Sequence, residues 1–221
     1  MSVSDNLLHI KSTLPEHVTL VAVSKTKPVS GIMEAYNAGQ RIFGENKIQD
    51  MADKYEAMPK DIQWHMIGHV QRNKVKYMAP FVALIHGIDN FKLLKEINKQ
   101  AEKHDRVINC LLQIKIASED SKFGLAPQDA IDIIQSEAFL ALKNVNIIGV
   151  MGMATFTDDE TQIESEFKLL KSTFNDLKTI NPNNSAFTTI SMGMSGDYKL
   201  AIQCGSTMVR VGSSIFGLRN Y

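Results

Sequence analysis

Lys25 is the residue of this 221-residue chain whose position first suggests chemistry. It follows an apolar run, residues 19–24, in which β-branched residues and the nearby Pro28 favour a buried strand over a piece of helix. An ammonium group at the end of such a strand is costly unless it is solvated, paired or used chemically. Taken alone, Lys25 fits a solvated lysine better than a functional one, because most lysines are exposed.

Two turns rich in glycine and serine, near the carboxyl end of the chain, could hold a phosphate group. Gly193 and Ser195 precede a short helical segment, and Gly212, Ser213 and Ser214 follow the last apolar run. Such turns let backbone N–H groups approach an anion, and a helix N-terminus adds a favourable dipole. Each turn alone could be an ordinary glycine turn, but the two together favour phosphate.

A phosphate site opposite a strand-end lysine suggests a phosphorylated aldehyde as ligand. The amine of Lys25 could form a Schiff base with it, since apolar surroundings lower the pKa of an amine. The aldehyde that fits is pyridoxal 5′-phosphate (PLP), whose ring nitrogen needs a partner. Arg210 is the charged candidate for that position. Because arginine cannot accept the pyridinium proton, it would keep the nitrogen unprotonated and weaken the cofactor as an electron sink.

Three further residues at the ends of apolar runs are predicted to contact the cofactor: Asn46, His65 and Met192. Asn46 is preferred to Glu45, because a second unpaired charge beside a Schiff base would be costly. His65 could instead be a hydrogen-bonded histidine in the core, and the two interpretations have equal weight. Met192 belongs to the same strand end as Ser195.

Three other lysines compete with Lys25 for the aldehyde. Lys27 precedes Pro28 and is expected to point outward. Lys115 ends another apolar run, where alternation could turn it either way, and Lys122 has acidic neighbours that predict solvation. Lys25 therefore remains the first choice. We predict no catalytic residue and no metal ligand.

Eight short apolar segments are predicted to be strands, and the amphipathic segments between them to be helices. The predicted strands span residues 19–24, 41–45, 63–68, 83–88, 107–114, 145–152, 186–192 and 208–212. The predicted helices span residues 5–14, 29–38, 48–58, 73–78, 90–104, 128–139, 158–179 and 196–203.

Strands that alternate with helices form either a closed barrel or an open doubly wound sheet. The chain carries neither the glycine-rich dinucleotide fingerprint nor the P-loop typical of open sheets. We therefore predict an α/β fold, a (β/α)8 TIM barrel, as a single domain over residues 1–221. In such barrels the chemistry is built from the carboxyl ends of the strands, where the candidate residues lie.

The composition argues against several classes of partner. Lys and Arg together number 24, and Asp and Glu together also number 24. The formal net charge is therefore zero, so no electrostatic field of the whole protein favours nucleic acid or an anionic membrane. The two cysteines, Cys110 and Cys204, form neither a disulfide framework nor a metal-ligand spacing. The first residues lack the pattern of a signal peptide, and no segment reaches membrane-spanning length. A cytoplasmic protein is expected.

Seven motif segments occur in the order typical of one known family. They are AVSKTKP at 22–28, FGEN at 43–46, WHMIG at 64–68 with QRNK at 71–74, SKFG at 121–124, GVMGM at 149–153, SMGMS at 191–195, and GSTMVRVG at 205–212 with IFG at 215–217. The chain thereby resembles the pyridoxal phosphate homeostasis proteins, which are single barrels similar to the amino-terminal lobe of alanine racemase.

The resemblance implies roles for the candidate residues. The family's cofactor lysine matches Lys25. Its phosphate contacts match Ser195, Gly212 and Ser213, and its pyridine-side arginine matches Arg210. Family members usually carry proline where this chain has His69, which puts the shape of that loop in doubt. They often carry threonine where this chain has Ser213, a change that keeps the hydroxyl group.

The resemblance also implies a function. The protein is expected to hold PLP as a lysine Schiff base in intracellular PLP (vitamin B6) homeostasis, with effects on amino-acid and keto-acid balance and without turnover. Apo forms of PLP-dependent enzymes are candidate recipients. The chain ends soon after the last predicted strand, so we expect no second domain with a catalytic tyrosine, and a monomer. The alternatives are a minimal PLP-dependent amino-acid racemase and, more weakly, a barrel enzyme acting on a sugar phosphate.

Overall fold

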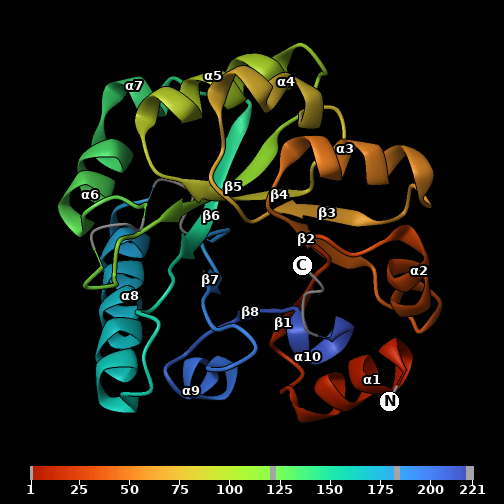
Figure 1. The fold of residues 1–221 in the computed structure, drawn as a ribbon. Helices are drawn as coiled ribbons and strands as arrows, with labels where there is room; N and C mark the ends of the chain where they lie inside the picture. Colours follow the sequence, from red (N-terminus) through yellow and green to blue (C-terminus); the bar gives the residue numbers. More distant parts are fainter. Residues whose placement is uncertain (1, 120–122, 182–184, 218–221) are drawn as a thin grey trace.

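The structure, a computed structural model, describes residues 2–119, 123–181 and 185–217. Within these residues eight parallel strands close into a barrel, in which each strand pairs with the next and β8 pairs with β1 (Figure 1). The strands are β1 (Thr19–Val23), β2 (Ile42–Glu45), β3 (Gln63–Met66), β4 (Leu84–Ile88), β5 (Ile108–Gln113), β6 (Val145–Met151), β7 (Thr189–Ser191) and β8 (Met208–Val211). The predicted barrel and all its strands are confirmed, although β7 is shorter than the predicted 186–192.

Helices lie around the barrel and connect its strands (Figure 1). They are α1 (Val3–Thr13), α2 (Val29–Asn37), α3 (Ile48–Ala57), the 3₁₀ turn η1 (Arg72–Lys74), α4 (Val75–Met78), α5 (Phe91–Glu102), α6 (Pro127–Gln135), α7 (Glu137–Leu140), α8 (Glu160–Ile180), α9 (Tyr198–Gln203) and α10 (Ser213–Phe216). In the described part of the chain, none of them combines the length and apolar character needed to cross a bilayer.

The predicted helix 128–139 is divided in two at Ser136. This residue has extended backbone angles (φ −70°, ψ 137°) and its side chain accepts a hydrogen bond from the Phe139 amide. Serine is a strong N-cap because its hydroxyl satisfies an amide that has no partner within the helix. Ser136 therefore ends α6 and begins α7. The short helix α10, which directly follows β8, was not predicted.

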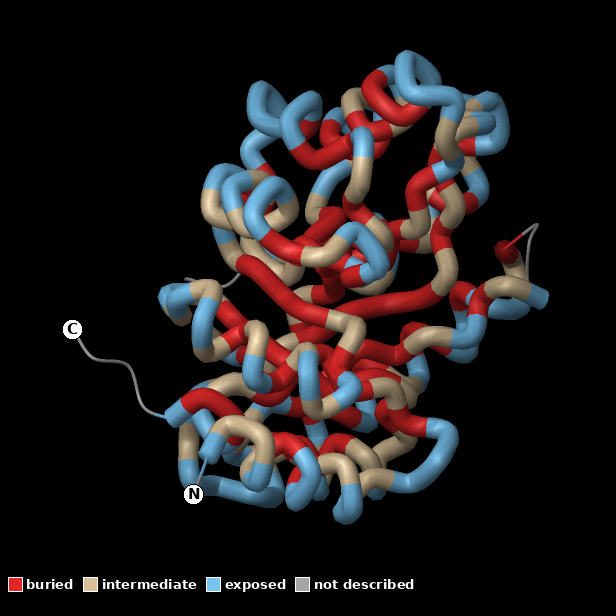
Figure 2. The backbone as a smooth tube through the Cα atoms, turned by 90° about the vertical axis from the view of Figure 1, so that its right-hand side faces the viewer, coloured by how far each residue is buried: buried red, intermediate tan, exposed pale blue. Residues whose placement is uncertain are grey.

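Buried residues lie mostly inside the molecule and exposed ones at its outer edge (Figure 2). The buried apolar side chains form two clusters, which the strands separate. In β1, Leu20 and Ala22 belong to the larger cluster, which includes helix residues, whereas Val21 belongs to a small cluster with residues of other strands. That small cluster consists of Val21, Leu84, Leu111, Met151 and Met208, joined by partly buried neighbours. Because successive side chains of a strand point to opposite faces, the small cluster fills the barrel interior and the larger one lies beneath the helices.

Candidate functional site

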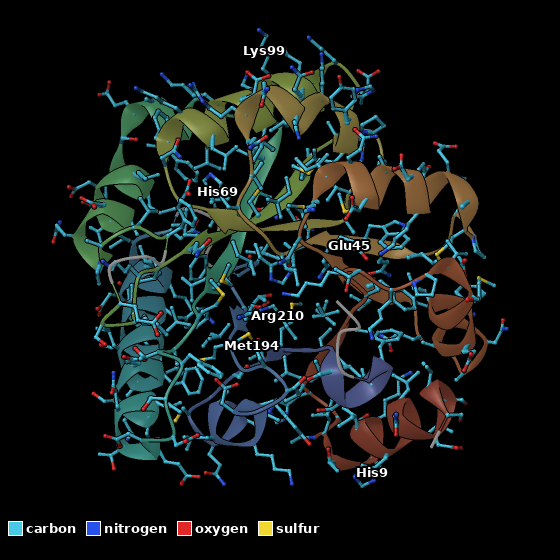
Figure 3. All side chains as sticks on the ribbon, viewed as in Figure 1. His9, Glu45, His69, Lys99, Met194 and Arg210 are labelled. Atoms are coloured by element: carbon cyan, nitrogen blue, oxygen red, sulfur yellow. The ribbon has the colours of Figure 1, made fainter. Side chains whose placement is uncertain are left out.

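A cavity of about 960 Å³ lies at the carboxyl ends of the strands. Six of the predicted site residues line it: Lys25, Asn46, Ser195, Arg210, Gly212 and Ser213. They come from the ends of β1, β2, β7 and β8, so closure of the barrel brings together residues that are far apart in the sequence. In Figure 3, Arg210 and Met194 lie inside the ring of helices, whereas His9 and Lys99 lie at its outer edge.

The backbone around Lys25 is set by strand alternation and by a sharp turn. Val23 and Lys25 both line the cavity, while the intervening Ser24 is buried and donates from Oγ to Glu45 Oε1 at 2.5 Å. Directly after Lys25 the chain adopts a left-handed conformation at Thr26, with φ 65°. The backbone of Lys25 is therefore fixed before it by strand β1 and after it by the turn at Thr26.

Arg210 is a buried cation held by uncharged oxygens. Its Nη1 donates to the Ser191 carbonyl at 2.8 Å and to Ser191 Oγ at 2.7 Å, and its Nη2 donates to the Gly152 carbonyl at 3.0 Å. Burial lowers the pKa of Arg210 to about 10, so the guanidinium remains charged at neutral pH. Two of its five N–H groups are left over from these bonds, and the residue lines the cavity.

The glycine and serine turns after β7 and β8 are joined by a hydrogen bond. The Gly212 amide donates to Ser195 Oγ at 3.2 Å. Gly212 is the N-cap of α10, so the first amides of this helix, at Ser213 and Ser214, begin a helical turn without an intrahelical acceptor. Both turns thus present short polar side chains and backbone donors on one side of the cavity.

The helix after β7 begins later than predicted. It starts at Tyr198 rather than at Gly196, because residues 194–197 form a turn in which the Met194 amide donates to Asp197 Oδ1 at 2.5 Å. Gly193 precedes this turn with φ 94°, and a Cβ there would lie 2.6 Å from the Ala201 Cβ. Glycine is required at that position because the α9 helix packs directly against the backbone.

Two predicted site residues, His65 and Met192, do not line the cavity. His65 is 4% exposed and its Nδ1 lies 3.1 Å from His86 Nε2, within the barrel. Burial lowers the pKa of His65 to about 3, so the ring is neutral. Met192 is fully buried in the cluster beneath the helices, because it follows Ser191 and alternation turns it outward. Of the two interpretations of His65, the geometry is that of a core histidine.

The competing lysines occupy different places. Lys27 lines the cavity, contrary to the prediction that it points outward, and its Nζ donates to the carbonyls of Phe216 at 2.9 Å and Gly217 at 3.1 Å. It therefore ties the end of α10 to the loop after β1. Lys115 is not among the described residues that line the cavity. Lys122 lies outside the described residues.

The rim of the cavity includes residues outside the predicted cofactor-binding set. Phe123 and His69 stack with ring centroids 4.1 Å apart, and His69 Nδ1 lies 3.0 Å from Asp89 Oδ2. Phe156 and Met194 line the cavity and are also exposed. His69, in the loop whose shape was in doubt, lines the cavity and its stacking with Phe123 makes it part of the mouth.

The loop between β6 and α8 forms one wall, with residues 153–158 in the lining. Glu166 of α8 holds this loop, since its carboxylate accepts from the Thr155 amide and hydroxyl, both at 2.6 Å. Burial raises the pKa of Glu166, but the hydrogen bonds from Thr155, Gln162 and Ser118 outweigh it and leave that pKa below its ordinary value. No sequence signal marked this contact, because Glu166 lies within an amphipathic helix. Among the described residues no group of three His, Cys, Asp or Glu is placed to hold a metal ion.

The fold and this set of residues define a class of barrel. The model of the alanine racemase N-terminal domain family matches residues 2–220 of the chain. The structure of PipY from Synechococcus elongatus PCC7942 without PLP has a TM-score of 0.91 at 32% identity and covers 98% of this chain and 100% of PipY. The PipY structure with PLP bound has a TM-score of 0.88 with the same coverage. Alanine racemase from E. faecalis, at 14% identity and TM-score 0.76, shares the fold over 58% of its own chain.

Sequence relatives narrow this class. The pyridoxal phosphate homeostasis protein of Pasteurella multocida is 38% identical, over 100% of this chain and 99% of the relative. The proteins of the same name from Schizosaccharomyces pombe and Escherichia coli K12 are 40% and 37% identical, over 92% and 94% of this chain and 85% and 88% of their own lengths. The chain therefore belongs to the pyridoxal phosphate homeostasis protein family, which confirms the resemblance seen in its motifs.

Proposed function

We propose that this protein binds PLP in the cavity at the carboxyl ends of the strands and acts in PLP homeostasis. The observation that carries the proposal is the lining of that cavity: a strand-end lysine, a buried arginine and two serine-glycine turns converge there. The names of the relatives and the PipY structure with PLP bound support the choice of ligand.

The donor set matches the three functional parts of PLP. Lys25 would supply the amine for its aldehyde, with which a lysine forms a Schiff base. Ser195, Gly212 and Ser213 would hold its phosphate through hydroxyl and amide donors, and the short helix that begins there favours negative charge. Arg210 would donate to its ring nitrogen. When bound, the cofactor supplies a reactive carbonyl and an electron-accepting ring.

Arg210 favours holding the cofactor over using it. A guanidinium has only donors, so the ring nitrogen facing it must stay an acceptor and therefore unprotonated. An unprotonated ring draws electrons less strongly, which disfavours removal of an α-proton from an amino acid. The three acceptors that hold Arg210 are backbone and hydroxyl oxygens, so no carboxylate lies within bonding distance of this cation in the described part of the chain.

The proposal includes the absence of turnover, with a minimal racemase as the alternative. Racemisation needs a positioned acid and base on opposite faces of the cofactor. The described residues that line the cavity include no tyrosine or cysteine, and His69 there is engaged by Asp89 and Phe123. We propose a carrier that passes PLP to apo forms of PLP-dependent enzymes, acting as a monomer in the cytoplasm.

One experiment tests the ligand and the lysine together. The purified protein is mixed with PLP, its visible spectrum is recorded, and the complex is reduced with borohydride before peptide mass mapping. We expect a visible band and a pyridoxyl group on Lys25. The absence of a band overturns PLP binding, and a group mapped to Lys27 or Lys115 overturns the assignment of Lys25.

A second experiment tests the carrier against the racemase. The PLP-loaded protein is incubated with each common L-amino acid, and D-isomers and loss of amine are measured. A carrier gives neither at a significant rate. Turnover of about 1 per second or faster, an ordinary enzyme rate, would establish the racemase instead.

A further inference from the structure

A row of buried polar side chains crosses the barrel beneath the cavity. It starts at Arg210 of β8, passes to Ser191 of β7 and His86 of β4, and ends at His65 of β3. The successive distances are 2.7 Å from Arg210 Nη1 to Ser191 Oγ, 3.0 Å from Ser191 Oγ to His86 Nδ1, and 3.1 Å from His86 Nε2 to His65 Nδ1. None of the four side chains is more than 4% exposed.

The hydrogen atoms of this row can be assigned in one direction. Arg210 can only donate, so Ser191 Oγ accepts from it and its own hydrogen is free to be donated to His86 Nδ1. His86 is then protonated on Nε2, which donates to His65 Nδ1. In the opposite direction both histidines donate toward Ser191, and the buried serine hydrogen is left without an acceptor. An unpaired buried hydroxyl is costly, so the first direction is favoured.

Both histidines are neutral in this arrangement. Burial lowers the pKa of His86 well below its ordinary value, with smaller contributions from His65 and Arg210. Two neutral rings and a hydroxyl, each presenting its acceptor toward the guanidinium side, form an aligned row of dipoles. Such a row stabilises a buried cation whose hydrogen bonds all go to uncharged oxygens and whose charge is otherwise favoured by Asp197. Hydrogen bonds in series also polarise one another.

We propose that Ser191, His86 and His65 are positioning residues that hold the Arg210 guanidinium charged and aimed at the ring nitrogen of PLP. This inference rests on the proposed function, because it assigns those residues a role toward that ligand. Their influence reaches the cofactor through Arg210 alone, since none of the three lines the cavity.

Two disruptive variants and one conservative variant test the role. Ser191→Ala removes one acceptor of Arg210, and His86→Phe removes the acceptor of the serine hydrogen. We expect each to raise the PLP dissociation constant about tenfold, at the lower end of effects known for residues that orient a metal ligand, and to shift the visible band. His86→Gln keeps one acceptor and one donor and should restore both properties toward those of the wild type.

Leu111→Ala is the matched control. Leu111 is fully buried in the cluster that fills the barrel, and its side chain makes no polar contact with the row. It should lower the melting temperature without changing the dissociation constant or the band. If Ser191→Ala and His86→Phe behave in the same way, the row is only structural and the proposal is overturned.

A measurement without PLP separates this inference from the proposed function. Nitrogen-15 NMR of the histidine rings should show His86 and His65 neutral at pH 6, with His86 protonated on Nε2. A His86 ring protonated on Nδ1, or charged at that pH, overturns the assigned direction whatever the protein binds. If wild-type protein fails to bind PLP while the ring assignments hold, the proposed function falls together with the role toward the ring nitrogen, whereas the dipole row around Arg210 stands.

Discussion

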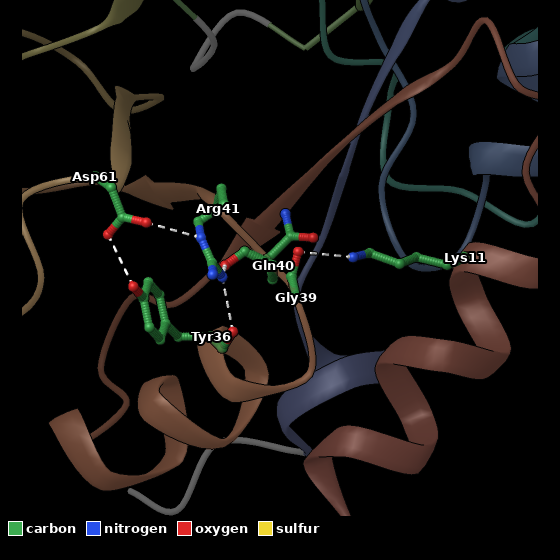
Figure 4. A network of polar contacts seen from close by, with 6 residues as sticks. All are labelled: Lys11, Tyr36, Gly39, Gln40, Arg41 and Asp61. Atoms are coloured by element: carbon green, nitrogen blue, oxygen red, sulfur yellow. Dashed lines mark hydrogen bonds and ion pairs between the residues drawn. The ribbon is translucent and has the colours of Figure 1, made fainter.

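The two ends of the barrel each hold an arginine, and the partners of the two arginines differ in charge. At the amino end, Arg41 pairs through Nε with Asp61 Oδ2 at 2.9 Å and donates from Nη1 to the Tyr36 carbonyl at 2.8 Å (Figure 4). Asp61 also accepts from the Tyr36 hydroxyl at 2.9 Å, and Lys11 donates to the Gly39 carbonyl at 3.3 Å. Each of these polar groups finds its partner within the protein.

At the carboxyl end, Arg210 is more deeply buried yet contacts only neutral oxygens. Burying a charge without a directly bonded counter-charge is unfavourable, and proteins rarely do so without a use for the charge. Residue type alone therefore does not tell whether an arginine supports the fold or binds a ligand. Arg41, matched by a carboxylate, fastens two segments, whereas we propose that Arg210, held by uncharged oxygens next to the cavity, keeps its charge for a ligand.

The largest effect is expected at the strand-end lysine. Lys25→Ala should abolish the visible band and the borohydride-stable label, because the amine that would bond to the aldehyde is gone. Spectra of wild type and variant at equal PLP concentration check this. Lys27→Ala is the control, since Lys27 lines the same cavity but donates to the carbonyls that end α10. A full visible band in Lys25→Ala would mean that Lys25 does not bond to PLP. This lysine would then no longer distinguish the carboxyl end of the barrel as the ligand-binding end.

One ion pair at the carboxyl end resembles the Arg41–Asp61 pair of the amino end, but it is buried. Lys54 Nζ lies 2.6 Å from Glu45 Oε1 and also donates to the Ser24 carbonyl at 2.9 Å. Removing one partner of a buried pair leaves the other charge uncompensated. Lys54→Met should therefore lower the free energy of unfolding at pH 7 by about 3 kcal/mol, measured by urea denaturation.

The sign of the pH dependence sharpens this expectation. Burial raises the pKa of Glu45, an effect that attraction to Lys54 opposes, so loss of Lys54 raises that pKa further. A carboxyl group whose pKa is higher in the folded protein costs stability as the pH rises from its unfolded value to its folded value. The deficit of Lys54→Met should thus be smaller at pH 5 than at pH 7. A deficit that grows toward acid pH would show that Glu45 is not the group left unpaired.

Arg210→Met separates binding from stability. The substitution removes a buried charge together with its desolvation cost, but it orphans the acceptors at Ser191 and Gly152, so the net change in unfolding free energy should be small. Affinity for PLP should fall about tenfold to a hundredfold, because a hydrogen bond to a charged group contributes about 1.5–3 kcal/mol. Titration of PLP and urea denaturation of the apo protein together test this. A large loss of stability with unchanged affinity would place Arg210 with the structural arginines.

Arg41→Met should lower stability slightly and leave PLP affinity unchanged, the reverse of the pattern expected for Arg210→Met, and its effect should be the smallest of these variants. Arg41 is 42% exposed and Asp61 is 55% exposed, so their ion pair is largely solvated. Such pairs contribute at most about 1 kcal/mol, and the measured unfolding free energy should fall by no more than that. PLP affinity should be unchanged, because the network lies at the opposite end of the barrel. Reduced affinity in this variant would show that the two ends are coupled.

The strand ends were predictable because each strand is a short apolar run that stops at a polar or glycine residue. That placement located Lys25, Asn46, Arg210 and the two turns at one rim. The phase of each strand was harder to predict. Ser191 and Met192 are neighbours, and only the pairing of β7 with β8 shows that the serine faces inward.

His86 escaped the sequence-based prediction, since it lies in the middle of an apolar strand. The signal was present nevertheless: His65 and His86 occur at similar depths in consecutive strands, and buried polar groups require partners. The wall formed by residues 153–158 could not be predicted in the same way. Its position depends on Glu166 and on a glutamate of another loop, Glu119, which accepts from the Phe156 amide.

The turn at Thr26 has a consequence for protein engineering. Its φ of 65° is unfavourable for a β-branched side chain, and such a conformation costs on the order of 1 kcal/mol or more. Protein engineering that raises thermostability by relieving backbone strain would place glycine at position 26. Glycine would also release the backbone immediately after Lys25, whose direction depends on that turn. A design strategy for a more robust version of this barrel should therefore hold position 26 constant and seek its gains elsewhere.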